Sequence, residues 1–269
     1  MRTEDQPLDR RETVLVRQEP RAVEAMDFAI APKRLRRVLA TAIAVLVTLS
    51  VVGQAAVYLL PDFPLRDALA SLFYVAREAS VPTLYSTVQL LVAAMLLAAI
   101  AFWHQRAGNP RSRTWWLLAG VVAFLALDES TLIHERFIGP TRALLGIGSG
   151  PLLFAWVIPA AIATVVFALA IRRFAGSLPR PTRRLTTTAF ALFVTGALGV
   201  ELVGSAYASS NGREMFAYTL IVAVEEALEM VGVAVLIYAL LDYIPVGLPG
   251  AARWSARVVP APVRDDQSR

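Results

Sequence analysis

The stretch WWLLAGVVAFLALDESTLIHERF, residues 115–137, decides the class of fold. Residues 114–134 have the length of a helix that crosses about 30 Å of hydrocarbon. Asp128 and Glu129 nevertheless lie near the end of this run, and His134 and Glu135 follow at once. An ionised side chain at mid-bilayer costs about 2.5–3.5 kcal/mol on insertion scales and commonly marks a functional site. The stretch therefore predicts a membrane-spanning helix with a polar site near one end.

The composition of the whole chain extends this prediction. The chain has 269 residues, of which 57% are hydrophobic, and its mean hydropathy is +0.56. These values are too apolar for an ordinary soluble domain and are typical of a multi-pass membrane protein. The absence of cysteine excludes disulfides, thiolate metal sites and cysteine nucleophiles. A net charge of +5 indicates orientation in the bilayer, and we expect no nucleic-acid partner.

Six apolar runs are long enough to cross a bilayer as helices. The fold class that we expect is therefore all-α: a polytopic membrane protein with six transmembrane helices in a bundle. Residues 1–32 are expected to form an N-terminal cytosolic tail, 33–243 the transmembrane domain and 244–269 a C-terminal cytosolic tail. The first apolar run begins too far from Met1 for a cleaved signal peptide. The expected spans are about 38–60, 84–103, 114–134, 151–171, 185–207 and 216–241.

The arginines and the single lysine predict the orientation of these spans. Alternate connections, counted with the two tails, carry 21 Lys and Arg on one side and five on the other. Basic residues accumulate on the cytoplasmic side of membrane proteins. We therefore expect both termini in the cytoplasm and the protein in the inner, or plasma, membrane.

Local patterns predict three further features of the connections and span ends. Proline inside the fourth span, Pro159, is expected to kink it. His104, at the cytosolic end of the second span, is expected to lie at the membrane interface. Apolar residues at helical spacing after Pro64 predict a short amphipathic helix on the outer side. These residues are Leu65, Leu69, Leu72 and Phe73.

Acidic side chains are concentrated within the predicted spans, and no Lys or Arg lies inside any of them. Their cost must be offset by protonation, by a bound cation or by arginines that reach in from loops, such as Arg136 or Arg142. In the predicted topology all of them lie in the outer half of the bilayer. Three helices that carry acids at one level most simply face a common cavity open to the outside. The six acids are Asp128, Glu129, Glu201, Glu225, Glu226 and Glu229.

Helical spacing predicts how these acids are grouped. Glu225 and Glu226 lie four and three residues before Glu229, so the three share one stripe of the sixth span. Glu201 shares a face with small residues, which allow helices to approach closely. On an ideal helix, Asp128 and Glu135 share a face, with His134 beside it.

Carboxylates with imidazole and without thiol favour a hard or borderline divalent cation, such as Mn²⁺, Fe²⁺, Zn²⁺ or Ca²⁺. The chain has only two histidines and no Glu-x-x-His motif, so a dinuclear redox site is not indicated. The expected metal ligands are Asp128, His134, Glu201, Glu225 and Glu229. The expected surrounding or alternative ligands are Glu78, Glu129, Glu135, Glu226, Ser205 and Tyr218.

Three segments resemble those of a group of uncharacterised bacterial multi-pass proteins. They are ExxxPTxxS at 78–86, LDExxxIHE at 127–135 and EExxEMxG at 225–232. The resemblance implies an inner-membrane protein with acidic and histidine motifs in its spans. It implies no particular activity.

Three classes of function fit these features. The first is a metal-dependent membrane enzyme in which the metal activates water against a lipid-like substrate that enters from the bilayer. The second is a proton- or cation-coupled transporter, which would use the acids as exchange sites. The third is a structural or sensing membrane subunit whose acids are protonated. The sequence predicts neither the substrate nor the oligomeric state.

Overall fold

The computed structural model describes residues 32–247, and within this range the chain is helical and contains no strand. Predicted tails 1–32 and 244–269 therefore lie almost wholly outside the described residues. The elements are α1 (Pro32–Leu59), α2 (Arg66–Phe73), α3 (Val81–Arg106), α4 (Ser112–Thr131), η1 (His134–Phe137), α5 (Ile138–Leu145), α6 (Val157–Gly176), α7 (Arg180–Val194), η2 (Thr195–Val200), α8 (Glu201–Asn211) and α9 (Phe216–Gly247).

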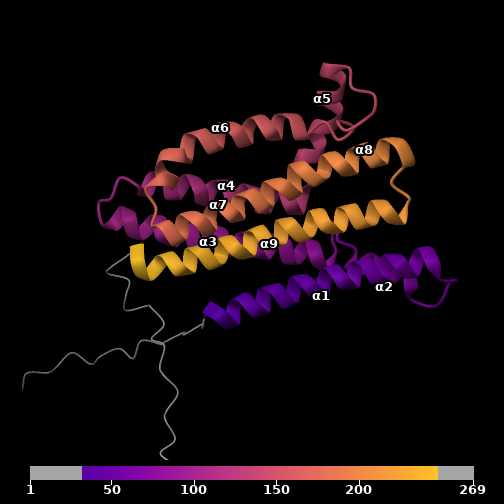
Figure 1. The fold of residues 1–269 in the computed structure, drawn as a ribbon, viewed down its shortest axis with the longest axis horizontal. Helices are drawn as coiled ribbons and strands as arrows, with labels where there is room; N and C mark the ends of the chain where they lie inside the picture. Colours follow the sequence, from indigo (N-terminus) through magenta and orange to yellow (C-terminus); the bar gives the residue numbers. More distant parts are fainter. Residues whose placement is uncertain (1–31, 248–269) are drawn as a thin grey trace, which may run out of the picture.

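Helix α9 is the centre of the bundle (Figure 1). It packs against α1, α3, α7, η2 and α8, whereas α6 touches the bundle mainly through η2. Helices α3 and α4 form a closely packed pair beside it. The all-α architecture is thus confirmed, and α9 is in position to bring side chains from several helices together.

Among residues 32–247, four helical stretches have the character of membrane spans, and there are five if one bent pair of helices counts as a span. The stretches 34–59, 81–106, 157–176 and 180–211, the last made of α7, η2 and α8, are each long and apolar enough to cross a bilayer. Helix α4 qualifies only when it is joined to the segment His134–Leu145, from which it is bent by 79°. A helix covers all or most of each of the six predicted spans. The sixth predicted span lies on α9, which is not among the candidate membrane spans given above.

Two predicted spans have different ends in the structure. The third was predicted to reach residue 134, but α4 ends at Thr131 because Leu132 adopts a left-handed conformation with φ of 51°. The fourth was predicted to begin at 151, but α6 begins at Val157. Pro159 therefore lies in the first turn of α6, where a missing N–H is harmless, and the predicted kink at this proline is wrong.

The connection after α1 contains the predicted short helix, now α2, which packs against α1. The approach is close: a Cβ on Gly53 of α1 would lie 3.1 Å from the Ala70 Cα. Helix α3 then begins with Ser80, whose side chain accepts a hydrogen bond from the Thr83 N–H, and with Pro82 in the first turn. These contacts attach α2 to α1 and define where α3 begins.

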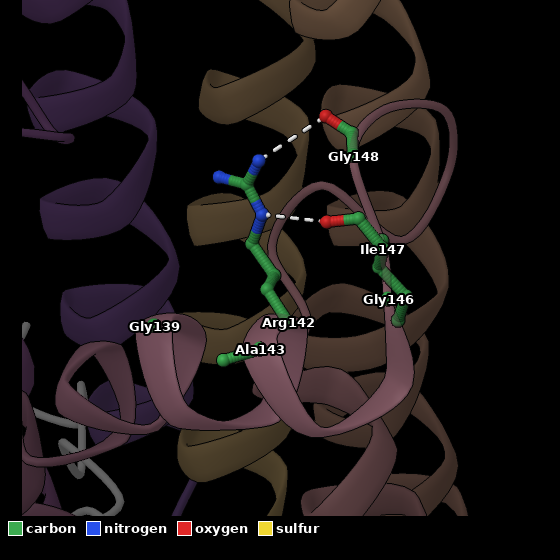
Figure 2. A pocket seen from close by; sticks show the side chains of 6 residues that line it. All are labelled: Gly139, Arg142, Ala143, Gly146, Ile147 and Gly148. Atoms are coloured by element: carbon green, nitrogen blue, oxygen red, sulfur yellow. Dashed lines mark hydrogen bonds between the residues drawn. The ribbon is translucent and has the colours of Figure 1, made fainter.

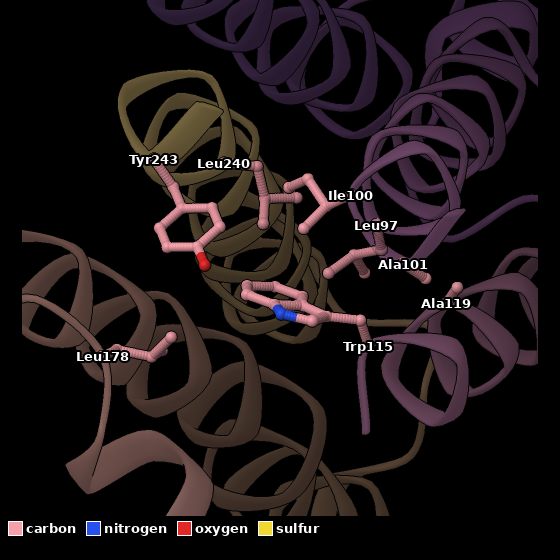
Figure 3. Close-up of a cluster of buried hydrophobic side chains, with 8 residues drawn as sticks. All are labelled: Leu97, Ile100, Ala101, Trp115, Ala119, Leu178, Leu240 and Tyr243. Carbon is pink, nitrogen blue, oxygen red and sulfur yellow. The ribbon is translucent and has the colours of Figure 1, made fainter. Parts of the chain in front are cut away.

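The opposite end of the bundle is an aromatic core (Figure 3). Trp115 of α4 is 1% exposed and packs edge-on against Phe174 and obliquely against Tyr243. His104 stacks on Trp115, and its Nε2 lies 2.9 Å from the Tyr243 hydroxyl. His104 is therefore buried between helices, and its hydrogen bond to Tyr243 on α9 was not indicated by its sequence position; its expected place at the membrane interface stays a prediction.

Candidate carboxylate site

The acidic stripe of α9 faces η2. A Cβ placed on Gly196 would lie 2.8 Å from the Glu225 carbonyl oxygen and 2.9 Å from the Glu229 Cγ. Glu225 is buried, while Glu226 and Glu229 are half-buried. Only glycine lets the two helices approach this closely, so Gly196 determines how near the α9 glutamates come to η2 and α8.

The element η2 is a π-helical turn inserted between α7 and α8. Such turns are rare, and inside longer helices they are frequent at functional sites. Glu201 follows this turn directly as the first residue of α8. Within α8 the small residues predicted to share the face of Glu201 are buried, as Gly204, Ser205 and Ala208 show, so this part of the predicted face is confirmed.

The carboxyls of Glu201 and Glu225 lie within hydrogen-bonding reach of each other. The indole Nε1–H of Trp156 also donates to the Glu201 Oε1 at 2.9 Å. A carboxylate is only an acceptor, so a hydrogen bond between two carboxyls requires a proton on one of them. Two neighbouring carboxyls repel each other when both are ionised, so this pair needs positive charge close to it.

The end of α4 presents Asp128 and His134 as a hydrogen-bonded dyad. The Asp128 Oδ1 accepts the His134 backbone N–H at 2.8 Å, and the Oδ2 accepts the ring Nδ1–H at 2.8 Å. The left-handed Leu132 turns the chain back and makes this contact possible. The prediction that His134 and Glu135 continue the α4 helix is wrong, although Asp128 and His134 do lie together.

His134 also connects the dyad with the segment before α6. Its ring centroid is 4.4 Å from that of Trp156, the residue that donates to Glu201. His134 and Glu201 are within charge–charge range of each other. Side chains from α4, η1, the start of α6 and α8 are thus contiguous at one level of the bundle.

Glu129 links α4 with α9, since its carboxyl is in charge–charge range of Glu226 and Glu229. Glu201 is also in range of both of these α9 carboxyls. We refer to the five carboxyls that interact in this way as the acidic layer. The acidic layer consists of Glu129, Glu201, Glu225, Glu226 and Glu229.

Of the remaining predicted site residues, Tyr218 lies beside the acidic layer, and Glu78 and Glu135 are exposed. Tyr218 is in range of Glu201 and Glu225, so it borders the acidic layer. Glu78 is exposed, and Glu135 is exposed but in range of His134. Ser205 accepts a hydrogen bond from the Phe154 N–H at 2.9 Å, which attaches the segment before α6 to α8.

One loop arginine, Arg213, lies near the acidic layer, whereas Arg142 forms its hydrogen bonds elsewhere. Arg213, whose guanidinium lies 4.2 Å over the Phe154 ring, is in charge–charge range of Glu201. Arg142, an expected partner of Glu129, instead donates to the carbonyls of Ile147 and Gly148 at 3.1 Å each (Figure 2). That arginine lines a separate hollow of about 380 Å³ at the glycine-rich turn after α5.

Sequence reasoning missed the contribution of α3. Gln89 is 3% exposed, and both polar atoms of its amide are buried without a partner among the described residues. The next residue on the same face is Ala93, which packs in a buried cluster with α4 and α9. Its neighbours there are Ala126 and Val233. Glu129 lies about one helical turn from Ala126, and Glu229 lies about one turn from Val233. Gln89 is therefore at the level of the acidic layer.

Tyr74, in the connection after α2, packs against the first turns of α9. Its hydroxyl is in hydrogen-bonding reach of Thr219 and in range of Glu226. Burial raises the pKa of the Tyr74 phenol above its ordinary value. The neutral phenol is therefore the form that the fold stabilises.

The expected metal ligands do not form a ready metal site in the described part of the chain. Among residues 32–247, no three His, Asp or Glu side chains surround a common point at a spacing that a metal ion accepts. The donor types suit a hard or borderline divalent ion, but their arrangement does not form a ready coordination shell.

The fold and the site define a class of all-helical proteins with several helices able to span a membrane. Within that class, the chain belongs to the family described as a domain of unknown function, DUF8692, whose model matches residues 38–244. The match includes the three segments whose resemblance to uncharacterised proteins was noted from the sequence, and it confirms that resemblance. No curated protein and no solved structure matches the chain.

Proposed function

We propose that this protein is an integral inner-membrane protein of six spans, with both termini in the cytoplasm, whose acidic layer binds a cation near the outer face. The charge asymmetry of the connections supports the orientation. Large apolar side chains that are exposed on α1, α3 and α6 support burial of these faces in lipid. Among them are Val45, Val52, Leu84, Met95, Ile162 and Val166.

The observation that carries this proposal is the convergence of five carboxyls from three separate stretches of helix. Carboxyls in an apolar environment repel one another unless positive charge is present between them. No Lys or Arg occurs within the predicted spans, and Arg213 reaches only the Glu201 end of the layer. A cation is therefore needed to balance the acids at the α9 end.

In the arrangement described above, the proton is the cation that fits best. Glu201 and Glu225 are neighbouring carboxyls, and a proton held by one of them removes the repulsion between the two. A divalent metal ion is the second candidate, which the buried and unpartnered amide of Gln89 favours as an additional oxygen donor. Metal binding would require the carboxyls to rotate toward one another.

The test is metal analysis of the full-length protein purified without chelator, followed by titration with Mn²⁺. Glu225→Gln with Glu229→Gln is the test variant, and the exposed Glu78→Gln is the matched control. One or two equivalents of metal in the wild type, lost in the double variant alone, would establish the metal candidate. Absence of metal from all three, with protonated carboxyls in the wild type, would establish the proton candidate. Ionised carboxyls without any bound cation would refute the proposal.

A second candidate function is a membrane enzyme that acts on a lipid-like substrate. The observation in its favour is the Asp128–His134 dyad, in which the aspartate orients the imidazole through Nδ1 and leaves Nε2 for acid–base chemistry. Lipid extracts from cells that express wild type or His134→Ala would test this function. A lipid species that changes with the wild type and not with the variant would support an enzyme, and identical profiles would argue against one.

A further inference from the structure

We propose that the hollow beside Arg142 binds the phosphate group of an anionic phospholipid in the outer leaflet of the membrane. This site lies apart from the acidic layer. Its assignment rests on the proposed function, which places the connection after α4 on the outer side of the membrane. Three features carry it: the arginine itself, the glycine-rich turn after α5 and the exposed leucines of α5.

The guanidinium of Arg142 is held in a fixed orientation by the turn that follows α5. Its Nε donates to the Ile147 carbonyl and its Nη2 to the Gly148 carbonyl, at 3.1 Å each. Arginine has further N–H donors, and those on Nη1 have no acceptor among residues 32–247. Figure 2 shows Nη1 directed away from the turn. The turn therefore positions a cation that still has donors for a ligand.

The charge of this hollow favours an anion. No carboxylate in residues 32–247 forms an ion pair with Arg142. The unused donors on Nη1 and Nη2 form a fork that matches two oxygens of a phosphate group. A zwitterionic headgroup would need a carboxylate for its ammonium, and no acidic side chain is among the described residues that line the hollow. These residues are Gly139, Arg142, Ala143, Gly146, Ile147 and Gly148.

Glycine keeps the space beside the guanidinium open. A Cβ on Gly139, Gly146 or Gly148 would meet no atom within 4 Å. Gly146 also has a φ of 66°, the left-handed conformation that ends α5 and begins the turn. The hollow has a volume of about 380 Å³. Because a water molecule occupies about 30 Å³ of the liquid, a phosphate group with its oxygens fits in this volume.

Helix α5 has the position and exposure of a helix at a membrane surface. The segment His134–Leu145 is bent by 79° from α4, so it runs nearly parallel to the membrane surface when α4 crosses the bilayer. Leu144 and Leu145 are 83% and 52% exposed. Leu144 follows Arg142 by two residues and therefore projects from the opposite face of the helix. An interfacial helix buries its apolar face below the headgroups, which leaves a cation on its other face at the level of the lipid phosphates.

A second short helix is consistent with a membrane surface at this level. Figure 1 shows α2 and α5 at the same end of the bundle. Leu69 and Leu72 of α2 are exposed, as are the leucines of α5. Two short helices with exposed apolar side chains at one end of the bundle are typical of helices that lie at the boundary of headgroups and acyl chains.

The experiment is native mass spectrometry of the full-length protein in detergent, titrated with phosphatidylglycerol. Arg142→Gln is the test variant, because glutamine removes the charge while its amide can still donate to a carbonyl of the turn. Arg136→Gln is the matched control, since Arg136 is exposed in the same connection and does not line the hollow. We expect Arg142→Gln to weaken the tightest lipid site by about tenfold, the size of one hydrogen bond to a charged group. Arg136→Gln should leave that site unchanged.

A second variant, Gly139→Leu, separates lipid binding from a merely structural role of Arg142. It retains the arginine and both of its hydrogen bonds to the turn, and its Cβ meets no atom within 4 Å. The larger side chain fills part of the hollow, so it should weaken the same lipid site without lowering the unfolding midpoint measured in the absence of lipid. Unchanged lipid affinity in either Arg142→Gln or Gly139→Leu would overturn the inference. An equal loss in Arg136→Gln would show attraction by charge alone and would overturn it as well.

Two further measurements identify the source of the phosphate and keep the proposed function distinct. Retention of phosphatidylglycerol in an excess of inorganic phosphate would support the lipid, and its displacement would assign the hollow to free phosphate and overturn the lipid assignment. Membranes washed with alkaline carbonate test integration into the bilayer. Loss of the wild type from washed membranes would overturn the proposed function, whereas an integrated wild type with the lipid affinity of Arg142→Gln would overturn this inference alone.

Discussion

Replacement of Gly196 by alanine tests whether the close approach of η2 and α9 builds the acidic layer. The new Cβ would lie 2.8 Å from the Glu225 carbonyl oxygen, 2.9 Å from the Glu229 Cγ and 3.2 Å from the Leu228 Cβ. The carbonyl is part of a helix and cannot rotate away. To restore an ordinary contact, η2 must retreat by about 0.6 Å, which is enough to lose a quarter or more of the local dispersion contacts.

The expected cost follows from this overlap. Extra methyl groups in packed interiors cost about 1–3 kcal/mol, whereas alanine is favoured over glycine by about 1 kcal/mol in a helix. Gly199→Ala is the matched control, because Gly199 lies in the same π-turn and its Cβ would meet only the Thr195 Cγ2 at 3.7 Å. The helix preference is common to both variants, so the difference between them isolates the overlap.

We therefore expect Gly196→Ala to be about 1–3 kcal/mol less stable than Gly199→Ala. The assay is reversible unfolding in mixed detergent micelles, followed by circular dichroism. Gly196→Ala should also weaken proton or metal uptake, because Glu225 and Glu229 move away from Glu201. Equal stability of the two variants would refute the packing of η2 on α9.

Three further predictions concern the rim of the site. Trp156→Phe removes the N–H that Glu201 accepts and should cost about 1–3 kcal/mol of stability, measured in the same unfolding assay; an unchanged midpoint would contradict this hydrogen bond. Because burial raises the pKa of Tyr74, its stabilisation is complete below the unfolded value of about 10 and is lost as pH rises through the folded value. Unfolding midpoints of wild type should thus fall in strongly alkaline buffer more steeply than those of Tyr74→Phe, and parallel curves would be evidence against a buried phenol. Glu78→Gln, at an exposed position, should change stability by less than about 0.5 kcal/mol, and a larger loss would place Glu78 in the site.

Apolar run lengths predicted the helical architecture well. A helix was found at every predicted span, and the short helix at Leu65–Phe73 is present as α2. The ends were less predictable, because α4 stops at a left-handed leucine, a conformation that leucine seldom adopts and that no sequence pattern signalled. The number of spans and the side on which the termini lie stay predictions.

The acids themselves were visible in the sequence, since charges within apolar runs are conspicuous. Their detailed geometry was not, because ideal helical spacing cannot predict a π-turn before Glu201 or a chain reversal before His134. Gln89 was missed since an uncharged amide in a helix carries no signal until its burial without a partner is known. Trp156 was missed for a related reason: its role depends on a contact with Glu201, 45 residues away.

The most direct test of the central claim is the static infrared spectrum of the full-length protein in nanodiscs at neutral pH, wild type beside Glu225→Gln with Glu229→Gln. We expect a protonated carboxyl band in the wild type that shifts in heavy water, disappears on binding of Mn²⁺ if a metal can replace the proton, and is reduced in the double variant. Identical spectra of the two proteins, with every carboxyl ionised and no metal bound, would contradict the claim that the acidic layer binds a cation.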